Sequence, residues 1–187
     1  MTNSKKISFI LLAIIFSVIL KSEREPFEST YVPLQAENIL IKNASVYDGD
    51  GNEYTNTDIL VQEGRIVAIG KDLPVTDDFK IIDATNKWVT PGIIDIHSHM
   101  GVYPAPGVST SSDGNEATSP VTADVWAEHS IWVQDPQYAL ALTGGVTSFH
   151  ILPGSANLIG GRGVTVKNLQ RNTINSMKFP DAPHSLK

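Results

Sequence analysis

Residues 91–99 read Pro91-Gly92-Ile93-Ile94-Asp95-Ile96-His97-Ser98-His99. After the Pro-Gly pair, the residues up to Ile96 form a nearly continuous apolar run, which is typical of a strand covered on both faces in a parallel sheet. We therefore expect a buried strand that starts at Ile93 and ends at two histidines. Parallel strands need a crossover connection, usually a helix, so this strand predicts an α/β fold.

The segment after this strand should complete a βαβ unit. Asp135, which precedes a proline, can cap a helix, and Gly144-Gly145 can end that helix before a second strand over 146–152. Between the first strand and the helix lies a segment rich in Pro, Gly and Ser, residues 101–120, followed by a short helix that we expect around 121–131. Long loops in compact domains tend to be functional, so the first of these segments is a candidate wall of a binding site.

Residues 36–90 carry a different pattern, in which short apolar alternations are separated by turn residues. The stretch from Ile59 to Ala68 predicts a hairpin, with Glu63-Gly64 at its turn because glycine supplies the positive φ that such turns need. Several short strands at close spacing indicate part of a small β-sandwich that precedes the α/β region.

Residues 1–22 have the form of a signal peptide or an N-terminal anchor. Two lysines precede an uncharged apolar stretch, Ile7 to Leu20. As a helix this stretch would rise about 21 Å, less than the roughly 30 Å hydrocarbon core of a bilayer. No small-x-small pair follows it, so an uncleaved anchor stays open. We expect export to the periplasm or the cell exterior, a linker over residues 23–35, and membrane contact only through the N-terminal segment.

The composition excludes several classes of function. The formal net charge is −6 and no basic run exceeds Lys5-Lys6, which argues against nucleic-acid binding. The chain has no cysteine, so disulfides, thiolate metal sites and cysteine nucleophiles are ruled out within it. A small molecule remains the expected partner, and the oligomeric state is left open.

His97 and His99 are the strongest chemical feature. Because side chains alternate along a strand, both project to one face, about 7 Å apart along the backbone. Neutral imidazole is a common ligand of Zn²⁺, and in α/β barrels the chemistry lies at the C-terminal ends of the strands. The pair is therefore a candidate site for a divalent metal, with zinc preferred. Two unrelated surface histidines would show the same spacing, so that alternative remains on spacing alone.

Two blocks of sequence resemble one enzyme superfamily. Residues 88–101, with their Pro-Gly pair, aspartate, both histidines and trailing glycine, resemble the entry strand of metal-dependent amidohydrolases. Residues 144–161 resemble the second barrel strand and its loop in imidazolonepropionase-related members. The resemblance implies a TIM (β/α)₈ barrel preceded by a small β-sandwich. It also implies that His97 and His99 bind the more buried of one or two divalent ions.

Three further residues are candidates for the same site. Asp95 shares the face of the histidines one layer deeper, where its carboxylate could orient the imidazoles or make a purely structural pair. His150 lies near the end of the second strand and could reach a substrate. Asn157 could hydrogen-bond a substrate or cap its own Gly-rich loop. That loop lacks the Gly-Lys-Ser/Thr ending of a P-loop and the Gly-x-Gly-x-x-Gly spacing of a dinucleotide site, so we reject nucleotide binding.

The chain is too short for the whole of the fold that it resembles. A complete (β/α)₈ barrel takes roughly 250 residues, so residues 91–187 would form only its first strands. Catalytic residues are then expected beyond Lys187, and the isolated chain is expected to be inactive. For the complete protein the resemblance implies a metal-dependent hydrolase of carbon–nitrogen bonds other than peptide bonds, foremost in cyclic amides. The alternatives are a non-catalytic binding module and a hydrolase of the same fold that acts on a phosphoester or a dipeptide.

Overall fold

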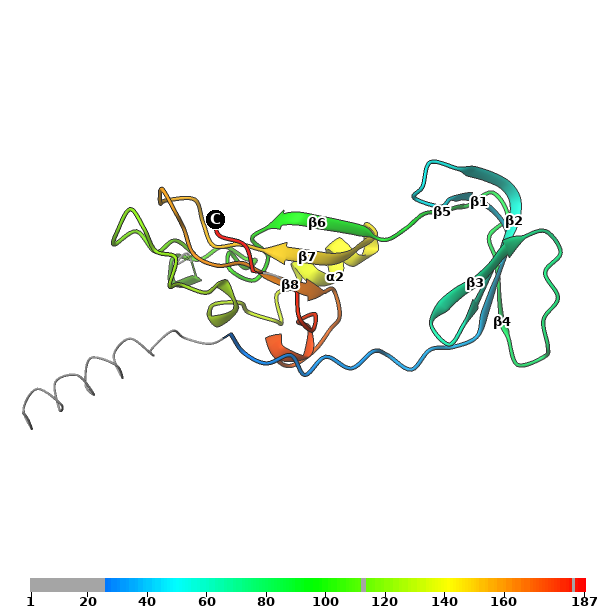
Figure 1. Cartoon of the computed structure of the whole chain (residues 1–187), viewed down its shortest axis with the longest axis horizontal. Coiled ribbons are helices and arrows are strands. Elements are labelled where there is room, and N and C mark those ends of the chain that lie inside the picture. Colours follow the sequence, from blue (N-terminus) through cyan, green and yellow to red (C-terminus); the bar gives the residue numbers. More distant parts are fainter. Residues whose placement is uncertain (1–25, 112–113, 183) are drawn as a thin grey trace, which may run out of the picture.

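The computed structural model describes residues 26–111, 114–182 and 184–187, and the predicted export segment lies outside them. The described chain is a mixed α/β structure with two sheets, each in its own lobe (Figure 1). We call them the five-stranded lobe, β1 to β5, and the three-stranded lobe, β6 to β8. No helix in the described ranges is long and apolar enough to cross a membrane.

The five-stranded lobe is formed by the first half of the chain. Its strands are β1 Ile39–Tyr47, β2 Glu53–Gln62, β3 Arg65–Gly70, β4 Lys80–Asp83 and β5 Trp88–Val89. The order is β3-β2-β1-β4, with β5 also paired to β1. The predicted hairpin is confirmed, because β2 and β3 pair antiparallel and the turn residues Glu63 and Gly64 have φ of 51° and 75°. Two positive φ values match the twist of the flanking strands.

The three-stranded lobe contains the predicted βαβ unit. Strand β6 Ile93–Ser98 pairs in parallel with β7 Val146–Ile151, and helix α2 Gln137–Thr143 lies between them in the chain. A third strand, β8 Val164–Lys167, pairs antiparallel with β7 and was not predicted. The single turns η1 Ser109–Ser111, η2 Ala127–His129 and η3 Ile174–Ser176 are the remaining regular elements described in this lobe.

Helix α2 begins and ends where local chemistry predicts. The Asp135 carboxylate accepts a hydrogen bond from the Gln137 N–H at 3.0 Å, so the aspartate satisfies one of the free donors of the first turn. At the other end the Gly144 N–H donates to Leu140, and Gly145 has a φ of 88°. The predicted capping of this helix is therefore confirmed.

The short helix expected around residues 121–131 is wrong, because only η2 forms there. The physical reason is competition for the backbone groups. Thr122 donates its N–H to Ile159 and Ala127 donates its N–H to Arg162, both at 2.9 Å. These long-range bonds take donors that a helix would need within its own turns, and the segment lies instead along the loop after β7.

The core of the three-stranded lobe lies on β7 and β8. Phe149, Ile151, Val164 and Val166 are almost fully buried, together with Met177. Strand β6 pairs only with β7 among the described strands, and Ile96 on it is 77% exposed. The expectation that β6 is covered on both faces is therefore wrong for this chain, because Ile94 and Ile96 on one face are 62% and 77% exposed and Ile93 on the other is 52% exposed.

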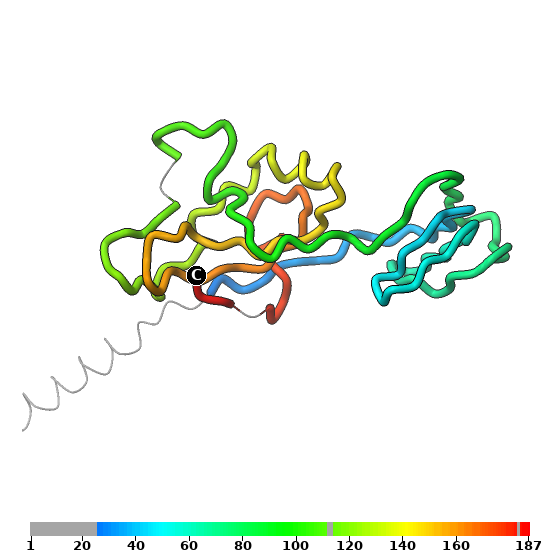
Figure 2. Tube along the Cα trace, turned by 90° about the horizontal axis from the view of Figure 1, so that it is seen from above, coloured from blue at the N-terminus to red at the C-terminus, as the bar shows by residue number. Residues whose placement is uncertain are grey.

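The chain crosses between the lobes twice. Residues 90–92 run from β5 to β6, and the segment before β1 leaves the three-stranded lobe and enters the other (Figure 2). Part of the predicted linker 23–35 is fastened to the three-stranded lobe, because Thr30 donates its N–H to the Asn175 carbonyl at 3.0 Å. The described part of this segment is thus more than a spacer.

Candidate functional site

The two histidines of the predicted metal site lie together at the end of β6. His97 belongs to the strand and His99 follows it directly. Their ring centroids are 5.4 Å apart, with the ring planes nearly perpendicular. His97 is exposed and His99 is partly buried. The structure therefore brings this pair together at the C-terminal end of a parallel strand.

His99 is held in one tautomer. Its Nδ1 lies 2.8 Å from the carbonyl oxygen of Leu152. A carbonyl can only accept, so Nδ1 carries the proton and Nε2 keeps a lone pair for a ligand. Leu152 is fixed in turn, because its own N–H donates to the Ser98 carbonyl at 2.8 Å. These two hydrogen bonds between the ends of β6 and β7 orient the His99 ring.

His97 is held through both its backbone and its ring. Asp95 Oδ1 accepts a hydrogen bond from the backbone N–H of His97 at 3.0 Å, so this carboxylate contacts the main chain and not an imidazole. The ring Nε2 is hydrogen-bonded to Nζ of Lys187. An ammonium group only donates, so the imidazole accepts with its Nε2 lone pair. A metal ion on that nitrogen and the Lys187 contact therefore exclude each other.

His150 is placed between two hydroxyl groups. Its Nδ1 lies 2.9 Å from Thr165 Oγ1 on β8, and its Nε2 is hydrogen-bonded to Ser185 Oγ. Burial lowers the pKa of His150 below its usual value, and the nearby His184 and His97 lower it further. The ring is therefore neutral at pH 7, with both nitrogens engaged by the protein.

Asn157 joins its own Gly-rich loop to the loop 101–120 that was predicted as a candidate wall. Its side-chain amide donates to the carbonyls of Glu116 at 2.6 Å and Ser119 at 2.7 Å. The Ala156 N–H adds a bond to the side chain of Asn115 at 3.2 Å. Both amide hydrogens of Asn157 are thus used within the protein, as expected for a loop cap.

Several known proteins are similar to this chain, although no family model matches it. The amidohydrolase tasK of Hapsidospora irregularis is 36% identical over 146 residues, which make up 69% of this chain and 15% of tasK. A dihydroorotase of Thermoanaerobacter sp. strain X514 is 42% identical over 81 residues, covering 43% of this chain and 18% of that protein. The crystal structure of an amidohydrolase from Thermotoga maritima MSB8 matches with a TM-score of 0.67 and 40% identity, over 76% of this chain and 37% of that one. The chain belongs to the amidohydrolase superfamily.

This amidohydrolase chain spans only a small part of its relatives: 15% of tasK, 18% of the dihydroorotase and 37% of the Thermotoga protein. The superfamily predicted from residues 88–101 is confirmed. The relatives named here include no imidazolonepropionase, so that narrower resemblance stays a prediction.

The histidine pair of this amidohydrolase suits a divalent metal ion. Metal-ligating histidines almost always donate their other ring N–H to a carboxylate, carbonyl or water, and His99 does so to Leu152. Catalytic zinc sites use three protein ligands, of which the pair could supply two. Within the part of the chain that the structure describes, no group of three or more His, Cys, Asp or Glu side chains is placed to hold a metal ion. The pair therefore supplies two of the three protein ligands that such a site needs.

Sequence reasoning missed that Asp135 orders the turn after His99. This carboxylate is 2% exposed, and its Oδ2 accepts from the Gly101 N–H at 3.1 Å while its Oδ1 accepts from Gln137. One buried group thus ties the start of α2 to the residues that follow the histidine pair. The position of Asp135 before a proline revealed its capping role, but no local pattern could reveal a bond across 34 residues.

Tyr103 lies in the loop 101–120 that was predicted as a candidate wall, but its contact with His99 was not predicted. Its ring stands edge-on to His99, with centroids 5.6 Å apart. Asn115 donates its side-chain N–H to the Tyr103 hydroxyl at 2.8 Å, and a Cβ at Gly114 would meet the ring at 2.4 Å. Glycine is therefore required where the loop passes the ring, and the tyrosine forms a fixed wall beside His99.

A cavity of about 470 Å³ lies beside this region. Its lining consists of Gly101, Val102, Pro104, Thr110, Ser111, Ser130 and Trp132. Neither histidine lines it, although Gly101 follows His99 by two residues. The cavity is therefore a neighbour of the histidine pair and not its binding pocket.

Proposed function

We propose that the complete protein is a metal-dependent hydrolase that cleaves carbon–nitrogen bonds other than peptide bonds, with a cyclic amide as substrate. The observation that carries this proposal is the His97–His99 pair at the end of β6, with His99 Nδ1 held by a carbonyl. Membership of the amidohydrolase superfamily supports the reaction class. The similarity to a dihydroorotase supports the substrate class.

We further propose that β6 and β7 are the first two strands of a (β/α)₈ barrel and that the five-stranded lobe is part of a β-sandwich. The parallel pairing of β6 with β7, with α2 between them in the chain, supports the barrel. Among the described strands the second edge of β6 is unpaired, as the closing strand of a barrel would require, whereas the antiparallel β8 on the other edge of β7 lies outside the all-parallel pattern.

In this mechanism His97 and His99 would hold a divalent ion. The chemistry that such an ion supplies is Lewis-acid polarisation of a carbonyl and acidification of water. Leu152 keeps the proton of His99 on Nδ1, and Asp95 holds the backbone of His97. Tyr103 limits the approach to His99 from one side. A group that transfers the proton to the leaving nitrogen is expected elsewhere in the complete protein.

The proposal is tested on the complete protein by measuring metal content and hydrolysis together. We expect cyclic amides such as dihydroorotate or a hydantoin to be hydrolysed in preference to phosphoesters and dipeptides. The double variant His97→Ala/His99→Ala should lose bound metal, and its activity should fall by more than about 100-fold, because loss of outer partners of metal ligands alone costs up to about that factor.

A matched control removes a different imidazole. His129→Ala removes an imidazole whose ring contacts Phe27 and not the histidine pair, and it should keep both metal and activity. Retention of metal and activity by the double variant would overturn the proposal. Preferred hydrolysis of a phosphoester or a dipeptide would overturn the substrate class alone.

We also propose that the protein is exported. The support is the sequence pattern of residues 1–22, two lysines followed by an uncharged apolar stretch. A reporter enzyme that is active only outside the cytoplasm, fused after Gln35, should be active in the host. Its inactivity would contradict export.

A further inference from the structure

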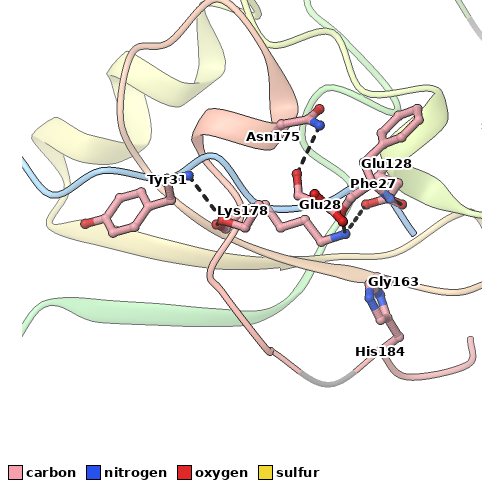
Figure 3. A network of polar contacts seen from close by, with 9 residues as sticks. Phe27, Glu28, Tyr31, Glu128, Gly163, Asn175, Lys178 and His184 are labelled. Atoms are coloured by element: carbon pink, nitrogen blue, oxygen red, sulfur yellow. Dashed lines mark hydrogen bonds and ion pairs between the residues drawn. The ribbon is translucent and has the colours of Figure 1, made fainter. Parts of the chain in front are cut away.

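An extended stretch of the N-terminal segment lies across the three-stranded lobe, far along the chain from the residues it contacts. We call Phe27–Tyr31 the strap, and we call the surface formed by Glu128, His129, Asn175, Lys178 and Phe179 the strap groove. Figure 3 shows the strap crossing this surface, with the side chains of Glu128, Lys178 and Asn175 directed towards it.

A buried ion pair lies at the centre of the groove. Lys178 Nζ is 2.6 Å from Glu128 Oε2, and the exposed fractions of the two side chains are only 6% and 0%. Both groups also bind one residue of the strap. The Phe27 N–H donates to Glu128 Oε1 at 2.8 Å, and Lys178 donates to the Phe27 carbonyl at 2.7 Å. A buried ion pair is favourable only if further hydrogen bonds satisfy its remaining atoms, and here the strap backbone supplies them.

The groove binds the strap at three further points of the main chain or a short side chain. Thr30 donates its N–H to the Asn175 carbonyl at 3.0 Å, and Asn175 returns a side-chain bond to the Glu28 carbonyl at 3.1 Å. The Ser29 hydroxyl donates to the Lys178 carbonyl at 2.6 Å. Most of these bonds address the peptide backbone, so they select an extended chain more than a particular sequence.

Aromatic contacts at the two ends of the strap add a sequence preference. The Phe27 ring lies 4.8 Å from the His129 ring, and the Tyr31 ring lies 6.0 Å from the Phe179 ring, measured between centroids. Such tilted pairs contribute beyond the area that they bury. The groove therefore fits an extended peptide with aromatic residues at its first and fifth positions.

We propose that the strap groove is a peptide-binding site whose ligand is the chain's own strap, and that it holds the strap non-covalently when the covalent link to β1 is cut. Residues 32–38 form that link, and Val32 and Leu34 within it are 69% and 60% exposed. Among residues 26–38, the hydrogen bonds and ring contacts described above are all made by Phe27–Tyr31. The proposal does not depend on the hydrolase activity, because none of its residues belongs to the histidine pair.

The test uses the complete protein with a protease site inserted between Gln35 and Ala36. After folding and cleavage, the N-terminal piece is followed by size-exclusion chromatography and mass spectrometry. We expect the piece to remain with the body of the protein. Thr30→Pro removes the N–H that binds the Asn175 carbonyl, and it should speed release of the piece by about tenfold, because one of the main-chain bonds between strap and groove is lost.

The matched control is Leu34→Pro, which introduces the same residue type in the exposed link and should leave release unchanged. Both substitutions lie outside the sheet, so loss of the lobe fold does not confuse the result. Separation of the piece from the unsubstituted protein directly after cleavage would overturn the proposal. Equal release from the two proline variants would also overturn it.

Discussion

His99 and His150 are both held at Nδ1, but by groups of different chemistry. The Leu152 carbonyl can only accept, and it therefore fixes the tautomer of His99. Hydroxyl groups hold His150 at both ring nitrogens, and a hydroxyl can donate or accept. The neutral His99 ring is thus held in one tautomer, whereas His150 can exchange tautomers without losing its partners.

The pKa of His150 gives a prediction at the scale of one residue. Burial and the neighbouring histidines lower this pKa, so the unfolded chain takes up a proton at His150 more readily than the folded chain. The stabilisation linked to His150 is then complete above pH about 6.5 and is lost as the pH falls through the lower pKa of the folded state. Titration of the His150 ring by NMR should give a midpoint below 6.5.

The variant His150→Gln serves as the control for that measurement, because it removes the titrating ring. Its unfolding free energy should lack this part of the pH dependence. A titration midpoint at or above 6.5 would contradict the proposed environment of His150.

The sequence predicted which residues form the histidine pair, but not how their rings are held. Strand periodicity places His97 and His99 on one face, because that relation depends on two positions of one strand. The partners of the rings are the Leu152 carbonyl and the Lys187 amine, which lie 53 and 90 residues away. No short pattern contains contacts of that length.

At the scale of elements, β6 and β7 are neighbours with opposite environments. Ile151 on β7 is fully buried, whereas Ile96 on the edge strand β6 is 77% exposed. We expect Ile151→Ala to lower the unfolding free energy by about 2–5 kcal/mol, because it leaves a cavity in the core. In the 187-residue chain, where Ile96 is 77% exposed, Ile96→Ala should change it by less than about 0.5 kcal/mol.

Urea unfolding of the two variants under identical conditions measures this difference. The substitution is the same in both, so the comparison isolates burial. Equal losses of stability would mean that β6 is covered in solution by another surface.

Elements with local signals were predictable, and elements that depend on distant partners were not. The Glu63-Gly64 turn and the ends of α2 carry their own chemistry in adjacent residues. By contrast, β8 forms by pairing with β7, and residues 121–131 form turns in place of a helix because some of their backbone groups bind the loop after β7. The short apolar runs in these two places fit several structures equally well.

At the scale of the whole molecule, the strap limits where the N-terminus can be trimmed. Removal of Phe27 would leave Glu128 and Lys178 buried without the main-chain groups that they bind. If the protein is exported as proposed, we therefore expect its mature N-terminal residue to be Phe27 or an earlier one. Intact-mass and N-terminal peptide analysis of the secreted material would show this. A stable mature protein that begins after Tyr31 would contradict it.

The division into two lobes could be predicted from the sequence, whereas the attachment of the N-terminal segment could not. Residues 36–90 and 91–187 differ in pattern, and the structure places β1–β5 and β6–β8 in separate sheets. The contact of residues 26–35 with the three-stranded lobe was not predicted from the sequence, because a polar stretch with prolines is typical of a linker. Its attachment depends on Glu128 and Lys178, which follow Phe27 by 101 and 151 residues.

The double crossing between the lobes has a mechanical consequence. The five-stranded lobe is entered from the strap and left through β6, so both ends of its chain are fixed on the same neighbour. A lobe that is attached at two points moves most freely by rotation about the line that joins those points. Loss of the strap would leave one pivot at residues 90–92, about which the lobe could swing and twist in every direction.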